Sequence, residues 1–188
     1  LEASAIKLLS AAAVATSYEA RVDIKSLVKT AELNDPQGTF NLFEDEYLIR
    51  LSNDKTYIEA LHPIRSKLLS EVLADPAFSP WIDSALFVMP SIPETDLETF
   101  LLYSFVENPY EFQKLFDAIK SLNIKTWGAV AGIGRALLWF GIRNHVIENK
   151  EVINAARLLA GNDGWSLLLQ NDIGGAIEKD PVEDLLDI

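Results

Sequence analysis

One histidine stands at a position where a side chain can bind an anion. His62 lies between Leu61, at the end of an apolar run, and Pro63, a residue type that favours the first turn of a helix. The first turn of a helix has unpaired backbone N–H groups and the positive end of the helix dipole, so it attracts phosphate. The His62 imidazole can have either of two roles. It either hydrogen-bonds nearby backbone or donates to a bound phosphate, and the pattern leaves both open.

Other residues have weaker patterns for chemistry. Arg135 and Arg143 lie eight positions apart on one face of an apolar segment, and we interpret them as arginines that reach solvent rather than as an anion-binding stripe. The glycines between residues 128 and 134 lack the Gly-x-Gly-x-x-Gly order, and the chain contains no P-loop motif, so we expect close helix packing there. Glu44–Glu46 are contiguous and point in different directions, which is typical of a solvated acidic loop and not of an acid/base pair.

Composition excludes several classes of function. The 188 residues include no cysteine and only two histidines, so disulfides, thiolate chemistry and a metal centre are not expected. The formal net charge of -12 argues against a nucleic-acid partner, because the mean field repels a polyanion. The apolar run Trp127–Ile142 is shorter than the roughly 20 residues that a membrane span needs, so it predicts a buried helix. We expect no membrane partner and a cytoplasmic location, with which the absence of cysteine is compatible.

The elements that position His62 are predicted to form one domain over residues 1–75. Helical spacing predicts a helix over Glu2–Ala15, a second over residues 24–33 after the N-cap Asp23, and a short helical turn near residues 40–43. Two apolar runs flank a polar tetrad and predict a two-stranded hairpin, and Pro63 then begins a further helix. The hairpin runs are Tyr47–Leu51 and Tyr57–Leu61, and the apolar face of the last helix is Ile64, Leu68 and Val72. Helices followed by a two-stranded wing describe a winged-helix domain, a fold that reads DNA or contacts proteins.

Residues 76–188 are predicted to form an antiparallel helical array, a helical arm or linker domain, with the boundary between Asp75 and Pro76. Pro80, Pro93 and Asn108 mark helix starts. Each opens a segment with an apolar stripe. The stripes are Leu97, Phe100 and Leu101; Phe112, Leu115, Phe116 and Ile119; Trp127, Val130, Leu137, Leu138 and Phe140; and Val152, Ala155, Ala156 and Leu159. We therefore expect a mostly α protein.

The residues around His62 carry a family resemblance. The wing and the helix start read Glu46-Tyr-Leu-Ile-Arg-Leu and Tyr57-Ile-Glu-Ala-Leu-His-Pro-Ile-Arg65. This resembles the winged-helix region of STAND NTPases, which are signal-transducing ATPases of the same broad group as NB-ARC and NACHT proteins. In that family a hydrophobic residue and a histidine end the wing, and the histidine contacts the β-phosphate of bound ADP in the resting state. Leu61 and His62 match these positions, whereas Pro63 replaces the usual acidic residue.

The motif resemblance covers about the first 75 residues, and the Leu-His-Pro-x-Arg form is similar to bacterial members, including those of antiviral defence. Beyond Asp75, the aromatic-rich helices, with Trp127 and Trp139, resemble the helical segment that follows the winged helix in this family and leads to a sensor. The resemblance implies a regulatory piece of a longer protein, which couples an upstream NTPase domain that binds ADP or ATP with Mg to a downstream sensor domain and to homo-oligomerisation on activation. It also implies that His62 contacts the nucleotide phosphate, with Arg65 as a second candidate for a phosphate or interdomain contact. The family's catalytic elements would lie upstream of Leu1, so we expect no enzyme activity from this chain by itself.

Two other classes of function remain open. A winged-helix transcription regulator needs a basic recognition helix, whereas the segment around Asn41 is followed by Glu44–Glu46. An adaptor would bind another protein through an apolar groove and would be indifferent to nucleotide. A salt-dependent shift of duplex DNA would favour the first alternative, and nucleotide-independent partner binding the second.

Overall fold

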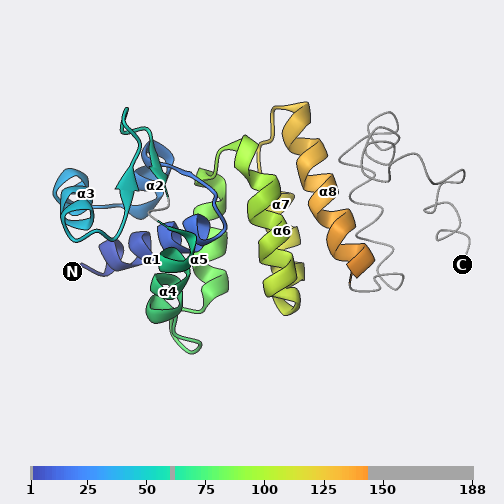
Figure 1. Cartoon of the computed structure of the whole chain (residues 1–188), viewed down its shortest axis with the longest axis horizontal. Coiled ribbons are helices and arrows are strands. Elements are labelled where there is room, and N and C mark those ends of the chain that lie inside the picture. The colour runs from blue at the N-terminus through green and yellow to red at the C-terminus, as the bar shows by residue number, and fades with distance from the viewer. Residues whose placement is uncertain (1, 60–61, 144–188) are drawn as a thin grey trace, which may run out of the picture.

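The computed structural model describes residues 2–59 and 62–143, over which the chain is mostly helical with one small antiparallel sheet (Figure 1). The α-helices are α1 (Ala3–Ser17), α2 (Ile24–Ala31), α3 (Pro36–Asp45), α4 (Pro63–Leu73), α5 (Trp81–Val88), α6 (Leu97–Glu107), α7 (Phe112–Ile119) and α8 (Trp127–Arg143). The strands are β1 (Val22–Asp23), β2 (Arg50–Leu51) and β3 (Tyr57–Glu59), and the 3-10 turns are η1 (Met89–Ser91), η2 (Glu94–Asp96) and η3 (Pro109–Glu111).

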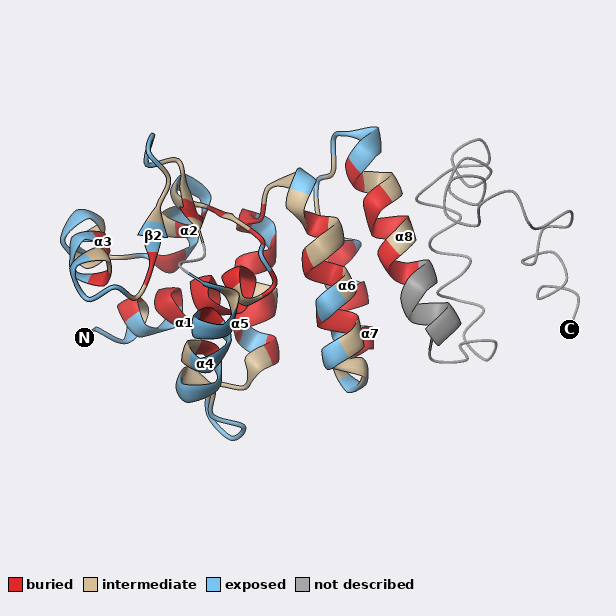
Figure 2. Ribbon diagram, viewed as in Figure 1, coloured by how far each residue is buried: buried red, intermediate tan, exposed pale blue. Residues whose placement is uncertain are grey.

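Helix α1 is the central element of the first half of the chain. Every residue from Leu8 to Thr16 is buried, so this alanine-rich helix is covered on all sides instead of along one stripe (Figure 2). Its most extensive contacts are with α4 and α5. The buried hydroxyls of Ser10 and Ser84, 2.8 Å apart, join α1 to α5. The helix predicted over Glu2–Ala15 is confirmed and extends to Ser17.

Side-chain caps begin the next two helices. Asp23 accepts a hydrogen bond from the Ser26 N–H at 2.7 Å, which confirms it as the N-cap of α2. Asp35 accepts from the Gly38 N–H at 2.9 Å and begins α3 with Pro36 in its first turn. The sequence pattern predicted only a short helical turn near residues 40–43. That prediction was wrong because Asp35 and Pro36, which it treated as a chain break, are a helix start.

The sheet has three strands, in the order β1-β3-β2, and all pairs are antiparallel. Ile58 pairs with Val22 on one side and with Leu51 on the other, so β3 is the central strand. The predicted hairpin corresponds to β2 and β3, but the prediction of two strands is corrected to three. Strand β1 has two residues, which is too short for an alternating pattern to reveal it.

Strand β2 is also shorter than the predicted run Tyr47–Leu51. Tyr47 has φ 54°, in the left-handed region, and its N–H donates to the carbonyl of Glu44 at 2.9 Å. The Leu48 N–H donates to the carbonyl of Phe43 at 2.8 Å. These bonds close the end of α3, so residues 47–49 form a turn and the strand begins at Arg50.

The second half of the chain is a series of helices whose starts follow the predicted signals. Pro80 directly precedes α5, and Pro93 and Asn108 precede the 3-10 turns η2 and η3 that lead into α6 and α7. The long apolar segment that begins at Trp127 is α8, and it packs against α6. No helix within residues 2–59 and 62–143 combines the length and apolar character that crossing a bilayer requires. The helix predicted over residues 152–159 lies outside the described residues.

One apolar cluster runs from α1 to α8, on both sides of the predicted boundary at Asp75 and Pro76. The apolar face predicted for α4 is not part of it. Ile64, Leu68 and Val72 are 66, 57 and 80% exposed, whereas Ser66 and Ser70 face inward against α1 and are buried. The packed side of α4 therefore combines the small, buried Ser66 and Ser70 with Leu69 and Leu73, which are partly buried against the core. A small serine permits the close approach of two backbones.

Candidate functional site at the start of α4

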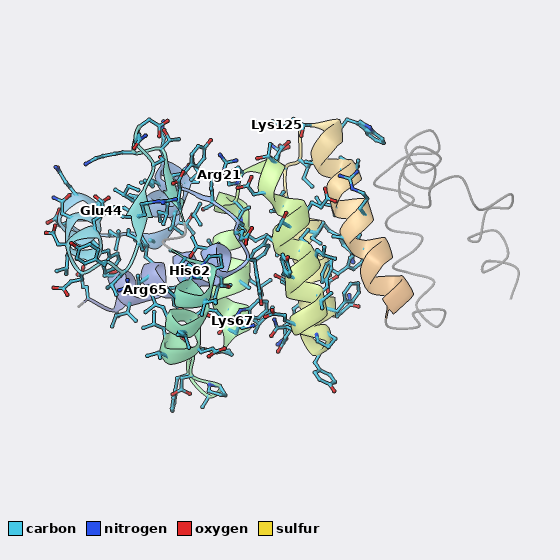
Figure 3. The ribbon with its side chains drawn as sticks, viewed as in Figure 1. Arg21, Glu44, His62, Arg65, Lys67 and Lys125 are labelled. Atoms are coloured by element: carbon cyan, nitrogen blue, oxygen red, sulfur yellow. The ribbon has the colours of Figure 1, made fainter. Side chains whose placement is uncertain are left out.

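The candidate site is the first turn of α4, which carries both predicted site residues, His62 and Arg65. His62 is the N-cap with extended backbone (φ −163°, ψ 131°), and Pro63 occupies the first helical position as predicted. Figure 3 shows His62 and Arg65 on this turn, and both are exposed. Leu61, which the resemblance paired with His62, lies outside the described residues.

The His62 ring is oriented by its own backbone. Its Nδ1 accepts a hydrogen bond from the Ile64 N–H at 3.3 Å, which confirms the first of the two roles of this residue. When Nδ1 accepts, the neutral ring carries its proton on Nε2. The exposed ring therefore presents an Nε2–H donor. The backbone bond fixes the ring and leaves this donor for a second partner.

Two more donors lie on the same turn. The first intrahelical bond runs from the Ser66 N–H to the carbonyl of His62 at 3.0 Å. Pro63 has no N–H and that of Ile64 is bonded to the imidazole, so the Arg65 amide is left without an acceptor within the helix. The Arg65 guanidinium makes no ion pair with any residue that the structure describes. The turn can therefore bind an anion without any covalent step.

Helix α4 is held in place by polar contacts from two other helices. The hydroxyls of Thr16 and Ser66 are 2.9 Å apart and buried, and they join α4 to α1. On the outer edge, Lys67 Nζ lies 3.0 and 3.1 Å from the two carboxylate oxygens of Glu107 at the end of α6. The position of His62 is therefore tied to α1 and α6.

The Glu107 carboxylate also receives a buried tyrosine. The Tyr18 hydroxyl donates to Glu107 Oε2 at 3.2 Å and accepts from Asn108 Nδ2 at 3.1 Å. Burial raises the pKa of Tyr18, and the charge of Glu107 raises it further, so the phenol stays protonated. Sequence reasoning missed Lys67, Tyr18 and Glu107 because their partners lie 40 and 89 residues away and no local spacing marks them.

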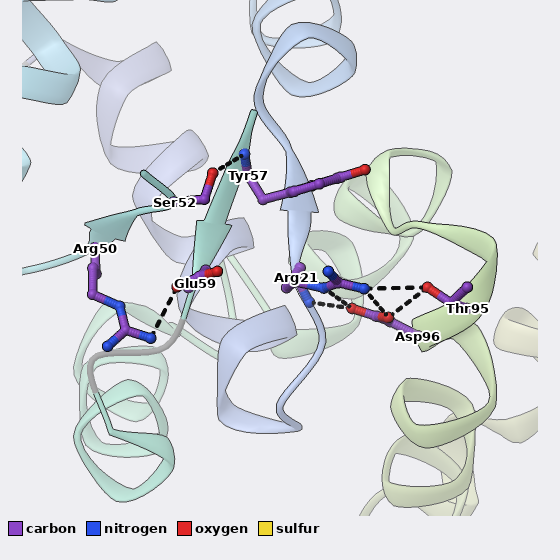
Figure 4. Close-up of polar contacts among 7 residues, drawn as sticks. All are labelled: Arg21, Arg50, Ser52, Tyr57, Glu59, Thr95 and Asp96. Carbon is purple, nitrogen blue, oxygen red and sulfur yellow. Dashed lines mark hydrogen bonds and ion pairs between the residues drawn. The ribbon is translucent and has the colours of Figure 1, made fainter. Parts of the chain in front are cut away.

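A second polar contact fastens the sheet to the start of α6 (Figure 4). Arg21, which directly precedes β1, donates from Nε and Nη2 to the two carboxylate oxygens of Asp96 at 2.9 Å each, and from its backbone N–H at 3.0 Å. Burial raises the pKa of Asp96, but the hydrogen bonds and charge of Arg21 outweigh it, so the pKa lies below its usual range. The Arg21 guanidinium also lies 5.1 Å from the centre of the Tyr57 ring.

Arg135 forms an ion pair, whereas the sequence suggested either exposure to solvent or an anion-binding stripe. Its Nε and Nη2 lie 2.7 and 2.5 Å from the carboxylate oxygens of Glu98 on α6, and its side chain is only 30% exposed. The prediction that it reaches solvent holds only in part, because α6 brings a carboxylate to a guanidinium that is partly exposed. A Cβ on Gly132 would come within 2.9 Å of the Glu98 Cβ, which confirms close helix packing at this glycine. The side chain of Arg143 lies outside the description.

The acidic residues do not form a second site. The prediction of an acidic loop was wrong for Glu44 and Asp45, which are the last two residues of α3. Glu44 Oε1 accepts from the Leu51 N–H at 3.3 Å and thereby supports β2, while Asp45 and Glu46 are exposed. Within residues 2–59 and 62–143, no group of histidine, aspartate and glutamate side chains is arranged to hold a metal ion.

Comparison with known proteins adds no family to this geometry. The chain matches no family model, no curated protein and no solved structure.

Proposed function

We propose that this chain is the winged-helix and helical-arm region of a STAND-type signalling ATPase. In this role it couples the ADP or ATP state of an upstream NTPase domain to a downstream sensor and to oligomerisation, as in bacterial antiviral defence. The chain itself catalyses no reaction. His62 contacts the β-phosphate of ADP, which the upstream domain binds with Mg, and Arg65 supports the same contact.

The observation that carries the proposal is the geometry of His62. The Ile64 N–H holds the ring through Nδ1, which leaves Nε2–H as the donor of an exposed residue on a turn that also carries the Arg65 guanidinium. A prearranged donor loses little entropy when it binds a phosphate. The turn is also fixed from behind by Thr16 and Ser66, so a change in the phosphate contact would be passed to α1 as well as along α4.

The order of elements supports the winged-helix part of the proposal. Helix α1 is followed by β1, then by α2 and α3, and then by β2 and β3, which pair as a wing beside β1. Helices α2 and α3 have the place of a helix-turn-helix. A fold of this kind hosts several functions, so the site must choose among them.

The charge of α3 favours the protein-contact use over the reading of DNA. Residues Pro36–Asp45 contain no lysine or arginine and end in Glu44 and Asp45. A helix that enters the major groove needs cations for the flanking phosphates. Nucleic-acid binding is therefore not part of the proposal.

The test is nucleotide retention by the full-length parent protein. We expect His62→Ala to release ADP roughly tenfold faster than wild type or more, because a hydrogen bond to a charged group contributes about 1.5–3 kcal/mol. The variant should also signal without its trigger. Bound nucleotide is measured by chromatography after denaturation, and the release rate by exchange with labelled ADP.

Lys29→Ala is the matched control, because Lys29 is an exposed cation on α2, away from this turn. It should retain ADP as wild type does. If His62→Ala holds ADP as tightly as Lys29→Ala and still requires its trigger, the assignment of His62 is wrong.

A further inference from the structure

The outer face of α4 is apolar although it is exposed to water. We define the α4 outer face as Ile64, Leu68 and Val72, which are 66, 57 and 80% exposed. They follow one another at four-residue spacing, so they form a single stripe about 12 Å long. A helix on the surface of a protein normally turns such a stripe inward. Here the inward side is formed by Ser66, Leu69, Ser70 and Leu73, so Ile64, Leu68 and Val72 are left as a second, outward apolar stripe.

A fourth apolar side chain is held at the end of the same helix. Phe78 is 89% exposed in the loop that follows α4. Asp75 and Ser79 exchange two backbone hydrogen bonds of 2.9 and 2.8 Å, and Asp75 Oδ1 accepts from the N–H groups of Ala77 and Phe78 at 2.8 and 3.2 Å. The loop is therefore closed by its own bonds, and the exposure of Phe78 is built into it. Exposed aromatic residues on fixed supports are typical of protein interfaces.

We propose that the α4 outer face is a self-association surface, on which a second copy of this chain packs its own α4 in antiparallel orientation. The stripe is symmetric about its middle residue, since Ile64 and Val72 each lie four positions from Leu68. A twofold axis through Leu68 therefore places Leu68 against Leu68 of the second copy, and Ile64 against Val72 in both directions. This inference is independent of the proposed function, because it rests on the exposure of α4 alone.

The charged edges of the stripe fit the same axis. Lys67 and Glu71 lie on one edge and Arg65 on the other, and in an antiparallel pair each edge meets its own copy. Measured along the helix axis, Glu71 of one chain is then offset by about 3 Å from Lys67 of the other chain. The two Arg65 residues are offset by about 9 Å along the same axis. Lys67 keeps its bond to Glu107 at 3.0 Å on the same edge. Opposite charges thus meet on one edge, and like charges are separated on the other.

The size of the surface sets the strength of the pair. At roughly 100 Å² of apolar area for each exposed side chain, the stripe and Phe78 present on the order of 400 Å². This is within the range of functional patches on single proteins. Two copies with their charged edges reach about 1,200 Å², the lower end of specific interfaces. We therefore expect a dimer with a Kd on the order of 10 µM.

Cysteine cross-linking tests the register, because the 188-residue chain has no cysteine of its own. We expect Leu68→Cys to form disulfide-linked dimers under mild oxidation with copper phenanthroline. Val72→Cys alone should not, since its two copies are about 12 Å apart along the axis and a disulfide needs Cα atoms within about 7 Å. A mixture of Val72→Cys and Ile64→Cys should link. Equal linking by all single variants would overturn the antiparallel register.

Sedimentation equilibrium of the 188-residue chain tests the association itself. We expect Leu68→Glu to raise the Kd at least tenfold. Tyr110→Glu is the control, because Tyr110 is 99% exposed on η3 and lies outside the stripe, and it should leave the Kd unchanged. Circular dichroism melts confirm that both variants fold. A wild-type chain that stays monomeric well above this Kd, or an equal loss in both variants, would overturn the proposal, whereas failure of the ADP test at His62 would not affect it.

Discussion

Two helix contacts in this chain are built in opposite ways. Where α4 meets α1, the buried groups on α4 are Ser66 and Ser70, and a hydroxyl pair lies at the contact. Helix α6 instead buries apolar groups such as Phe105, and its polar pair with α8, between Glu98 and Arg135, lies at the partly exposed edge. The contact of α4 thus has serines beside the partly buried Leu69 and Leu73 inside and a further apolar stripe outside, whereas α6 has apolar groups inside and charged groups at its edge.

The difference shows what each contact is suited to do. Burial of apolar surface is strong and non-directional, so it holds α6 and α8 together with little dependence on exact geometry. Hydrogen bonds between small side chains contribute less but require one position and orientation. Helix α4 is therefore precisely placed while its apolar stripe is left outside. That arrangement suits a helix that presents His62 and Arg65 at its start and an apolar surface along its length.

The largest effect should follow from opening the apolar core around α6. Phe105 is fully buried on α6, and its ring centre lies 4.9 Å from that of Phe112. Phe105→Ala should lower the free energy of unfolding by about 3–5 kcal/mol, because it removes apolar area and leaves a cavity. Urea denaturation followed by circular dichroism measures this. A loss below about 1 kcal/mol would mean that the second half of the chain is not held by its apolar core.

The sequence predicted the elements of this fold better than their contacts. The starts of α2, α4 and α5 carry local signals, namely Asp23, Pro63 and Pro80, and all three were predicted. Strand β1 was missed because it exists only by pairing with β3, which lies 35 residues further along the chain. The strand run at residues 47–49 was overpredicted, because backbone bonds to the end of α3 outweigh the β propensity of Tyr47 and Leu48.

The candidate site was predicted in part for the same reason. The position of His62 before a proline is a local pattern, and the structure places it at a helix start with Arg65 on the same turn. The role of α4 as a whole was not predictable in this way. Its apolar spacing indicated a core face, and only the three-dimensional packing of Ser66 on α1 shows that this face points outward. Helical periodicity identifies a stripe but not its partner.

On α4, replacing a buried serine by leucine should lower the free energy of unfolding more than replacing the exposed Leu68 by serine does. Ser66→Leu should lower the free energy of unfolding by about 1–3 kcal/mol, because the larger side chain separates α4 from α1 and removes the hydroxyl pair with Thr16. Leu68→Ser on the outer face should change it by less than about 0.5 kcal/mol. Both are measured by urea denaturation at a protein concentration well below the expected dimer Kd. If Leu68→Ser is the more damaging of the two, α4 packs through its apolar stripe and the comparison is reversed.

The smallest effect concerns the polar contact between Arg21 and Asp96, which fastens the sheet to α6. Arg21 keeps the folded pKa of Asp96 below that of the unfolded chain, despite the opposing effect of burial. The folded state therefore binds this proton less readily, so the contact stabilises the fold above the unfolded pKa of about 3.9. This stabilisation is lost as the pH falls through the folded pKa.

Asp96→Asn should lower the free energy of unfolding at pH 7 by about 1 kcal/mol, since the Arg21 side chain is 43% exposed and solvent screens the pair. The gap between the urea midpoints of wild type and Asp96→Asn, measured from pH 7 to pH 3, should narrow as the pH falls below the unfolded pKa, because the unfolded wild-type chain then binds a proton that folded Asp96 excludes. Other carboxylates with lowered pKa values, such as Glu94 and Asp117, weaken both proteins alike and cancel in this difference. A gap that stays constant down to pH 3 would show that the charge of Asp96 does not stabilise the contact, and that its shape alone joins the sheet to α6.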